Sequence, residues 1–218
     1  MKNIKRRFFI KSSSLIAGGL VLPSFKIERM ANNANNKKLK VSVIGCGGRG
    51  TGAAVQALRA DDNVELIAMA DAFKDRLENS LAAIKEEMDG EKKIDVKEKN
   101  RFTGFNGYKK AIDLADVVIL ATPPGFRPLH FKYAIDNDKH VFMEKPVATD
   151  ANGVRQVLKT AKDAQQKELN VVVGLQRRYQ FSYLNILKQV RRGVIGKITS
   201  GQVRWNGAGV WVRGRKPN

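Results

Sequence analysis

Residues 40–50, KVSVIGCGGRG, decide the fold of this chain. Residues 40–44 are a short run rich in β-branched side chains, which is typical of a buried parallel strand. A glycine pattern of the form G-x-G-x-x-G follows directly, and its members are Gly45, Cys46, Gly47, Gly48, Arg49 and Gly50. Small and apolar residues at helical spacing come next, and residues 64–70 form a second apolar run that ends at Asp71. Strand, glycine turn, helix and strand in this order predict a βαβ unit.

Each glycine of the pattern has a mechanical role at a dinucleotide site. Gly45 permits the tight turn, Gly47 lets backbone N–H groups approach a diphosphate, and Gly50 lets helix and strand pack closely. The diphosphate is expected at the positive end of the helix, where N–H groups lack intrahelical partners. We therefore expect all six residues of the loop to contact the cofactor, with Cys46 serving as a small packing residue and not as a nucleophile.

Asp71 is the candidate partner of the adenosine ribose. It lies at the tip of the second strand, about 20 residues beyond the last glycine, where a carboxylate accepts hydrogen bonds from the ribose hydroxyls and repels a 2′-phosphate. This placement favours NAD over NADP. Lys74 and Arg76 follow closely, so some tolerance of NADP stays open, and Arg76 is included among the candidate cofactor contacts.

The alternation of strands and helices continues beyond this unit. Further strands are predicted at residues 116–121, 140–143 and 170–173, and helices at residues 74–93, 129–137 and 151–166. This rhythm indicates right-handed crossovers and an α/β fold with a doubly wound parallel Rossmann sheet over residues 38–174. Ligands bind beyond the carboxyl ends of the strands in such sheets. The candidate residues at strand ends are Gly45, Asp71, Thr122, Lys145 and Gln176.

Four segments together resemble one enzyme family. They are residues 43–50 (VIGCGGRG), 121–123 (ATP), 139–146 (KHVFMEKP) and 192–198 (RGVIGKI). Their combination resembles the Gfo/Idh/MocA family, which includes glucose–fructose oxidoreductase and inositol dehydrogenase. The resemblance covers about residues 38–206 and implies an NAD-dependent dehydrogenase that acts on a sugar-like alcohol.

The resemblance also implies roles for individual residues. The lysine of the Glu-Lys-Pro motif lies between nicotinamide and substrate in the family, so Lys145 is the catalytic candidate and a substrate contact. Its ammonium could stabilise the alkoxide character that develops at the reacting oxygen. The motif is also expected to have a cis bond before Pro146 and a Glu144 that orients the loop. Lys145 is also a candidate cofactor contact. Further candidate cofactor contacts are Thr122, Pro123, His130 and Glu144, and further candidate substrate contacts are Gln176 and Arg178.

Two of these assignments have alternatives without a role in binding. His130 follows the Thr-Pro turn near the start of a helix, and it either lines the cofactor site or serves a structural role. Arg178 belongs to a pair of arginines that are either substrate contacts or surface charges. No metal site is expected, because a single cysteine excludes a multi-cysteine metal site.

Residues 175–218 resemble the beginning of the family's second domain, an α+β open sheet. A helix at residues 179–192 and a strand at residues 197–205 are predicted there. Family members run well beyond 300 residues and usually supply an aspartate and a histidine for proton transfer from this domain. We therefore interpret the chain as truncated in the second domain and expect these 218 residues to lack turnover by themselves. The full-length form is expected to be a homo-oligomer.

Residues 1–31 have the features of an export signal. A basic stretch that includes Arg6 and Arg7 precedes a short apolar run, and the arginine pair with the following aromatic and lysine resembles a twin-arginine signal. The apolar run is too short for a stable membrane span. We expect export of the folded protein to the periplasm by the twin-arginine machinery, with residues 32–37 as a linker. An ordinary basic amphipathic N-terminus is the alternative.

The charge distribution argues against a nucleic-acid partner. The formal net charge is +19, but most of the excess lies in residues 1–31 and 175–218, and no nucleic-acid-binding module accompanies it. Three functions stay open. The first is an NAD(P)-dependent oxidoreductase acting on a secondary alcohol of a sugar or cyclitol. The second is an NAD-dependent glycosidase that acts by transient oxidation and elimination, and the third is an inactive cofactor-binding or assembly protein.

Overall fold

The computed structural model describes residues 38–88, 92–204, 206 and 207. The predicted leader (1–31) and linker (32–37) lie outside the described residues, as do residues 208–218. None of the described helices combines the length and apolar character needed to cross a membrane.

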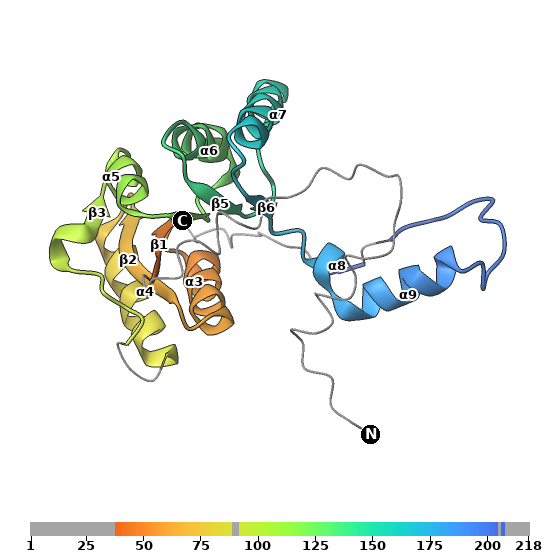
Figure 1. The fold of residues 1–218 in the computed structure, drawn as a ribbon, viewed down its shortest axis with the longest axis horizontal. Helices are drawn as coiled ribbons and strands as arrows, with labels where there is room; N and C mark the ends of the chain where they lie inside the picture. The colour runs from red at the N-terminus through yellow and green to blue at the C-terminus, as the bar shows by residue number, and fades with distance from the viewer. Residues whose placement is uncertain (1–37, 89–91, 205, 208–218) are drawn as a thin grey trace, which may run out of the picture. The chain divides into compact units, whose positions relative to one another are not determined.

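The described strands form one sheet in the order β3-β2-β1-β4-β5-β6 (Figure 1). Its strands are β1 (Leu39–Ile44), β2 (Val64–Asp71), β3 (Arg101–Thr103), β4 (Val117–Leu120), β5 (His140–Met143) and β6 (Val171–Val173). The pairs β1–β2, β2–β3 and β5–β6 are parallel. This is the strand order of dinucleotide-binding Rossmann sheets, so the predicted α/β fold is confirmed. Contacts divide the chain into two compact units, Met1–Val117 and Val118–Asn218.

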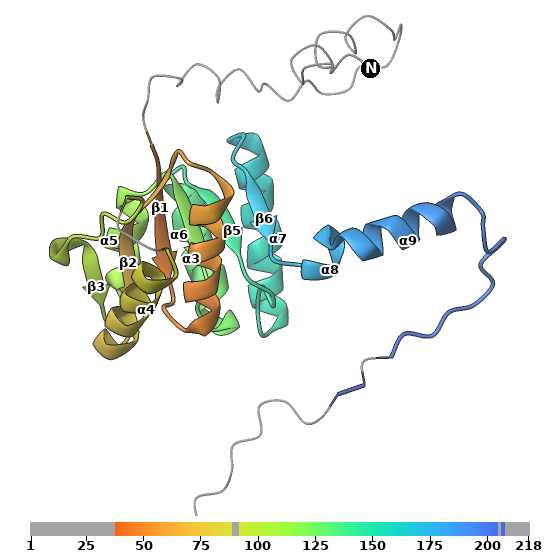
Figure 2. The same cartoon turned by 90° about the horizontal axis from the view of Figure 1, so that it is seen from below.

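The first unit is a three-layer arrangement. Its described helices are α3 (Gly48–Ala60), α4 (Lys74–Glu87) and α5 (Gly107–Leu114), with a 3-10 turn, η1, at Glu98–Asn100. Helices α3 and α4 cover one face of β1 and β2, and α5 covers the other (Figures 1 and 2). The apolar stripe of α4 packs inward, with Leu77, Leu81 and Ile84 buried. Burial of that stripe on the sheet is what holds the highly charged α4 in place.

Register places the glycine loop beside the end of β2. Ile44 pairs with Ala70, and the Gly45 N–H donates to the Ala70 carbonyl at 2.8 Å. Gly45 has a φ of 97°, in the left-handed region that glycine adopts without steric cost. The turn therefore leaves β1 next to Asp71, the last residue of β2.

The second unit places two helices over its strands. Helix α6 (Arg127–Asp136) follows the 3-10 turn η2 (Pro124–Phe126) and packs on β5, and α7 (Ala151–Gln166) packs against α6 (Figure 1). The Asp150 side chain caps α7 by accepting from the Gly153 N–H at 2.8 Å, which fixes where the helix begins. The bounds of β5 and α7 are those predicted from the sequence.

Several predicted boundaries differ from the structure. Helix α4 ends at Glu87, not at residue 93, and the predicted helix at 179–192 is divided into α8 (Gln176–Tyr179) and α9 (Phe181–Arg191). The predicted strand at 197–205 is wrong over its described part, because residues 197–204 are exposed and have no regular structure. A strand requires a neighbouring strand for its backbone groups, and the described residues provide none there.

Candidate functional site

The N-terminus of α3 is open and suited to an anion. Among the described residues no side chain caps this helix at Gly47, and its first turn contains no acidic residue. A Cβ built on Gly47 or Gly48 would have nothing within 4 Å, so the space over the loop is unobstructed. The N–H groups and dipole of a helix N-terminus favour a phosphate. The loop therefore fits the diphosphate of a dinucleotide.

Asp71 is attached to this loop by hydrogen bonds. Its Oδ2 accepts from the Cys46 backbone N–H at 2.7 Å, and its Oδ1 accepts from the Phe73 backbone N–H at 3.0 Å. Each carboxylate oxygen has a further lone pair, which is available to a ribose hydroxyl. The structure thus brings together the glycine loop and Asp71, the two parts of the cofactor site that the sequence predicts in this unit.

Cys46 serves as packing in the loop. Its side chain is buried, and its Sγ lies 3.5 Å from the Ala70 carbonyl. Burial, reinforced by the charge of Asp71, raises the pKa of the thiol to about 12. A thiol that stays protonated at neutral pH is a poor nucleophile, which agrees with the predicted role.

Arg49 and Arg76 are exposed on the first turns of α3 and α4. Arg49 belongs to the loop that fits the diphosphate. Arg76 is separated along the chain from Asp71 by the turn that leads into α4. Both assignments as cofactor contacts stay predictions.

The second unit contains a polar cluster where β4 and β5 end. Its members are the half-buried Thr122 and the buried Arg127, His130 and Glu144. The Arg127 guanidinium donates from Nη1 to the Glu144 carbonyl and from Nη2 to the Thr122 carbonyl. The Glu144 N–H donates to the Leu120 carbonyl at 3.0 Å. The cluster therefore connects the chain segments that follow two strands.

His130 is a neutral, buried member of this cluster. It is 5% exposed, its Nδ1 lies 3.2 Å from Thr122 Oγ1, and its ring stacks with that of Phe126. Burial, together with the Arg127 charge, lowers the pKa of His130 to about 4. An imidazole that is uncharged at neutral pH suits the structural alternative, and a cofactor contact through Thr122 stays a prediction.

The depressed pKa of His130 predicts an acid-dependent loss of stability. Because the unfolded state binds the proton first, the free energy of unfolding should fall as pH drops from about 6.5 to about 4, by about 3 kcal/mol. His130→Gln keeps a polar partner for Thr122 but does not titrate. Urea denaturation at about pH 6.5 and about pH 4 should show a larger loss of unfolding free energy in the wild type than in His130→Gln. Equal losses in the two proteins would contradict the assignment of a lowered pKa to a buried, neutral His130.

Lys145 is exposed at the second position after β5, and the Lys145–Pro146 peptide bond is cis, as the family resemblance implies. Pro123 is exposed at the start of η2. Gln176 and Arg178 are exposed in the short helix α8. The structure places Lys145 beside the polar cluster, whereas roles for Gln176 and Arg178 stay predictions.

Arg127 is the site residue that the sequence did not predict. It is the first residue of α6, where a cation opposes the positive end of the helix dipole. Helix stability does not explain an arginine at that position, just after a Thr-Pro turn and before Pro128, and this mismatch is the signal that could have indicated a role in the site. Its partners are backbone carbonyls, which every residue has, so the pattern of side chains in the sequence does not reveal them.

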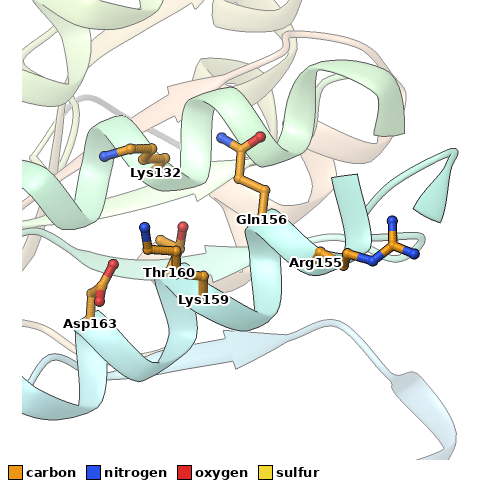
Figure 3. A pocket seen from close by; sticks show the side chains of 6 residues that line it. All are labelled: Lys132, Arg155, Gln156, Lys159, Thr160 and Asp163. Carbon is orange, nitrogen blue, oxygen red and sulfur yellow. The ribbon is translucent and has the colours of Figure 1, made fainter. Parts of the chain in front are cut away.

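A groove between α6 and α7 is lined by long polar and charged side chains, unlike the polar cluster at the strand ends (Figure 3). It is lined by Lys132, Arg155, Gln156, Lys159, Thr160 and Asp163. Lys132 pairs within α6 with Asp136 at 2.6 Å. The groove lies along the sides of two helices and not at strand ends, so the packing of long side chains explains it. The described residues include no group of three or more His, Cys, Asp or Glu side chains suited to a metal ion.

A negative charge in the open space over the loop should block the diphosphate. Gly47→Asp has room for its side chain but places a carboxylate where the phosphates bind, so NAD affinity should fall by about tenfold or more. Gln56→Asp adds the same charge on the exposed face of α3 and is the control. Calorimetric titration of both variants with NAD checks this prediction. Equal NAD affinities in Gly47→Asp and Gln56→Asp would exclude the loop as the diphosphate site.

Comparison with known proteins agrees with this geometry. Residues 39–173 match the model of an oxidoreductase family with an NAD-binding Rossmann fold. Among solved structures, myo-inositol 2-dehydrogenase from Lactobacillus plantarum is 29% identical, with a TM-score of 0.60 over 74% of this chain and 43% of that protein. A scyllo-inositol dehydrogenase from Lactobacillus casei, solved with NAD(H) and scyllo-inositol, is 23% identical, with a TM-score of 0.60 over 75% of this chain and 44% of its own. The predicted NAD-binding Rossmann domain is confirmed.

A curated relative has a different activity in its name. An α-N-acetylgalactosaminidase from Shewanella oneidensis is 26% identical over 94% of this chain and 46% of its own length. The chain thus spans about half the length of the curated relatives it matches.

Proposed function

The chain belongs to the Gfo/Idh/MocA oxidoreductase family, and from that premise we propose that it transfers a hydride between NAD and a secondary alcohol of a sugar or cyclitol. The observation that carries the proposal is the pairing of Asp71 with the glycine loop, through its 2.7 Å hydrogen bond from the Cys46 N–H. This pairing offers a diphosphate site and a ribose acceptor side by side. The similarity to an inositol dehydrogenase supports a polyhydroxylated substrate.

The chain's own residues bind and orient in this proposal. The N-terminus of α3 holds the diphosphate, and Asp71 holds the adenosine ribose and disfavours a 2′-phosphate. NAD, when bound, supplies the hydride acceptor. Lys145 donates a hydrogen bond to the substrate oxygen and stabilises the negative charge that develops there as the C–H hydride leaves and the carbonyl forms. The acceptor of the hydroxyl proton is expected from the second domain, as the family resemblance implies.

A glycosidase of the same fold is the second candidate, and the similarity to an α-N-acetylgalactosaminidase favours it. That reaction would use the same cofactor site and the same lysine, with a transient oxidation that allows the leaving group to be eliminated. It regenerates NAD in every turnover. Net NADH formation therefore separates the two candidates.

The test is an assay of the full-length form, with its second domain, using NAD and two kinds of substrate. Inositols and simple sugars should yield NADH, measured by absorbance, in step with the ketone product. A nitrophenyl N-acetylgalactosaminide that releases nitrophenol without net NADH would replace the dehydrogenase by the glycosidase. Neither signal from a protein that binds NAD would overturn both and favour a non-enzymatic cofactor-binding protein.

Export and assembly extend this proposal. The twin-arginine-like leader supports export of the folded protein to the periplasm, and the family resemblance supports a homo-oligomer. Fractionation of cells into cytoplasm and periplasm, with native mass spectrometry of the purified protein, tests these points.

A further inference from the structure

Arg127 is a buried cation at an unfavourable place in the fold. Its side chain is 2% exposed, and it begins α6, where the helix dipole repels positive charge. Burial lowers the pKa of its guanidinium, and the charge of Glu144 opposes that effect. Burying an ion costs free energy that good geometry and hydrogen bonds must offset. The cost of burying Arg127 must therefore be offset by the groups to which it donates, the carbonyls of Glu144 and Thr122.

Arg127 holds the main chain just beyond two strands. The Thr122 carbonyl follows the end of β4, and the Glu144 carbonyl follows the end of β5. Carbonyl groups beyond the last ladder position need partners when they are buried. A planar guanidinium can donate to both at once and in fixed directions. The two strand ends are thereby tied to one rigid group.

Glu144 extends this connection to β6. Its side chain is 7% exposed. A Cβ built on Gly174, the residue after β6, would lie 3.0 Å from Glu144 Oε2, so the carboxylate rests against the backbone there. The Gly174 N–H in turn donates to the Met143 carbonyl at 2.8 Å. Arg127 and Glu144 together thus connect the ends of three strands of this unit.

Lys145 is the next residue after this anchored segment. The Glu144 N–H is held by Leu120 and the Glu144 carbonyl by Arg127, while the Lys145 side chain is exposed. We propose that Arg127 is a positioning residue, which fixes the main chain at Glu144 and so sets the direction in which Lys145 leaves the sheet. The inference rests on the proposed function in one respect, namely that Lys145 is the group that meets the substrate.

Three variants test the role of the guanidinium. Arg127→Lys keeps the charge but loses the planar pair of donors, and Arg127→Met removes both. The double variant Arg127→Met/Glu144→Gln removes both charges, so that no uncompensated carboxylate stays buried. This double variant replaces Arg127→Met in the experiments if Arg127→Met alone does not fold. Arg155→Met, at an exposed arginine on α7, is the matched control.

The first readout is hydrogen exchange of the cofactor-free protein, followed by mass spectrometry. Exchange over residues 141–144, which include the Glu144 N–H bonded to the Leu120 carbonyl, should be faster by about tenfold or more in the Met and double variants, with Arg127→Lys in between, while residues 48–60 and the Arg155→Met control match the wild type. Unchanged exchange over residues 141–144 in the folded variants overturns the proposal. This readout needs no turnover, so it stands apart from any failure of the proposed function.

The second readout separates positioning from a merely structural role. In the folded Arg127 variants kcat should fall by about tenfold or more, while KM and the NAD dissociation constant stay within about threefold of the wild type. Faster exchange with an unchanged kcat overturns the positioning role. A full-length wild type that binds NAD but turns over no substrate overturns the proposed function, and the exchange result then decides the role of Arg127 in holding the loop.

Discussion

Replacement of Lys145 by alanine should lower kcat on a sugar or cyclitol by about 10²- to 10⁴-fold in the intact protein. The ammonium is the candidate donor to the oxygen on which negative charge develops, and that interaction strengthens only in the transition state. The NAD dissociation constant should stay within about threefold, because the loop and Asp71 supply cofactor binding. Steady-state kinetics and calorimetric titration measure the two quantities.

Lys159→Ala is the control for the loss of one positive charge. Lys159 is exposed on α7, where it lines the groove along the sides of α6 and α7 and not a strand end, so its variant should match the wild type. Lys145→Arg retains a cation with a different shape and should recover little activity. A Lys145→Ala enzyme with wild-type kcat would remove Lys145 from the mechanism.

Replacement of Asp71 by alanine should weaken NAD binding by about 10- to 150-fold, since hydrogen bonds to a charged acceptor contribute about 1.5–3 kcal/mol. Two effects combine in this variant. The ribose hydroxyls lose their acceptor, and the Cys46 N–H, which Asp71 holds at 2.7 Å, loses its partner. Affinity for NADP should fall less than affinity for NAD, because the charge that repels a 2′-phosphate is gone.

Asp71→Asn separates the two effects. Its amide oxygen still accepts from the loop, so the loss of NAD affinity should be smaller than in Asp71→Ala, while discrimination against NADP should weaken in both variants. Asp75→Ala, at an exposed acid in the first turn of α4, is the control. Titration of the wild type and of each variant with NAD and with NADP gives two dissociation constants per protein. Unchanged NAD affinity in Asp71→Ala would exclude the ribose contact.

The parts of the fold that sequence predicts well are those set by local patterns. The strand, glycine turn and helix around Gly45 follow from β-branched runs and from glycine's conformational freedom, both of which are visible within a few residues. The bounds of α7 were predictable because Asp150 and the apolar stripe of the helix mark them.

The parts that sequence misses depend on distant partners. Strand β3 has three residues and is defined by pairing with β2, and α5 has neither a capping side chain nor an acidic first turn among its described residues. The predicted strand at residues 197–205 has suitable residues but no neighbouring strand in the described chain.

The same reason explains which site residues were predicted. Asp71 and Lys145 stand at recognisable positions, at the end of a strand and in a short motif. Arg127 binds the carbonyls of Thr122 and Glu144, which are brought to it only by the crossover from β4 through α6 to β5. Backbone acceptors carry no residue identity, so no pattern of side chains could indicate this contact.

Calorimetric titration of the intact wild-type protein with NAD tests the central claim most directly. Binding of the diphosphate at the α3 N-terminus and of the ribose by Asp71 predicts one site per chain, with weaker binding of NADP. Ligand that binds only the folded state also predicts a rise in Tm with NAD concentration. Absence of heat and of any Tm shift with both dinucleotides would contradict the account.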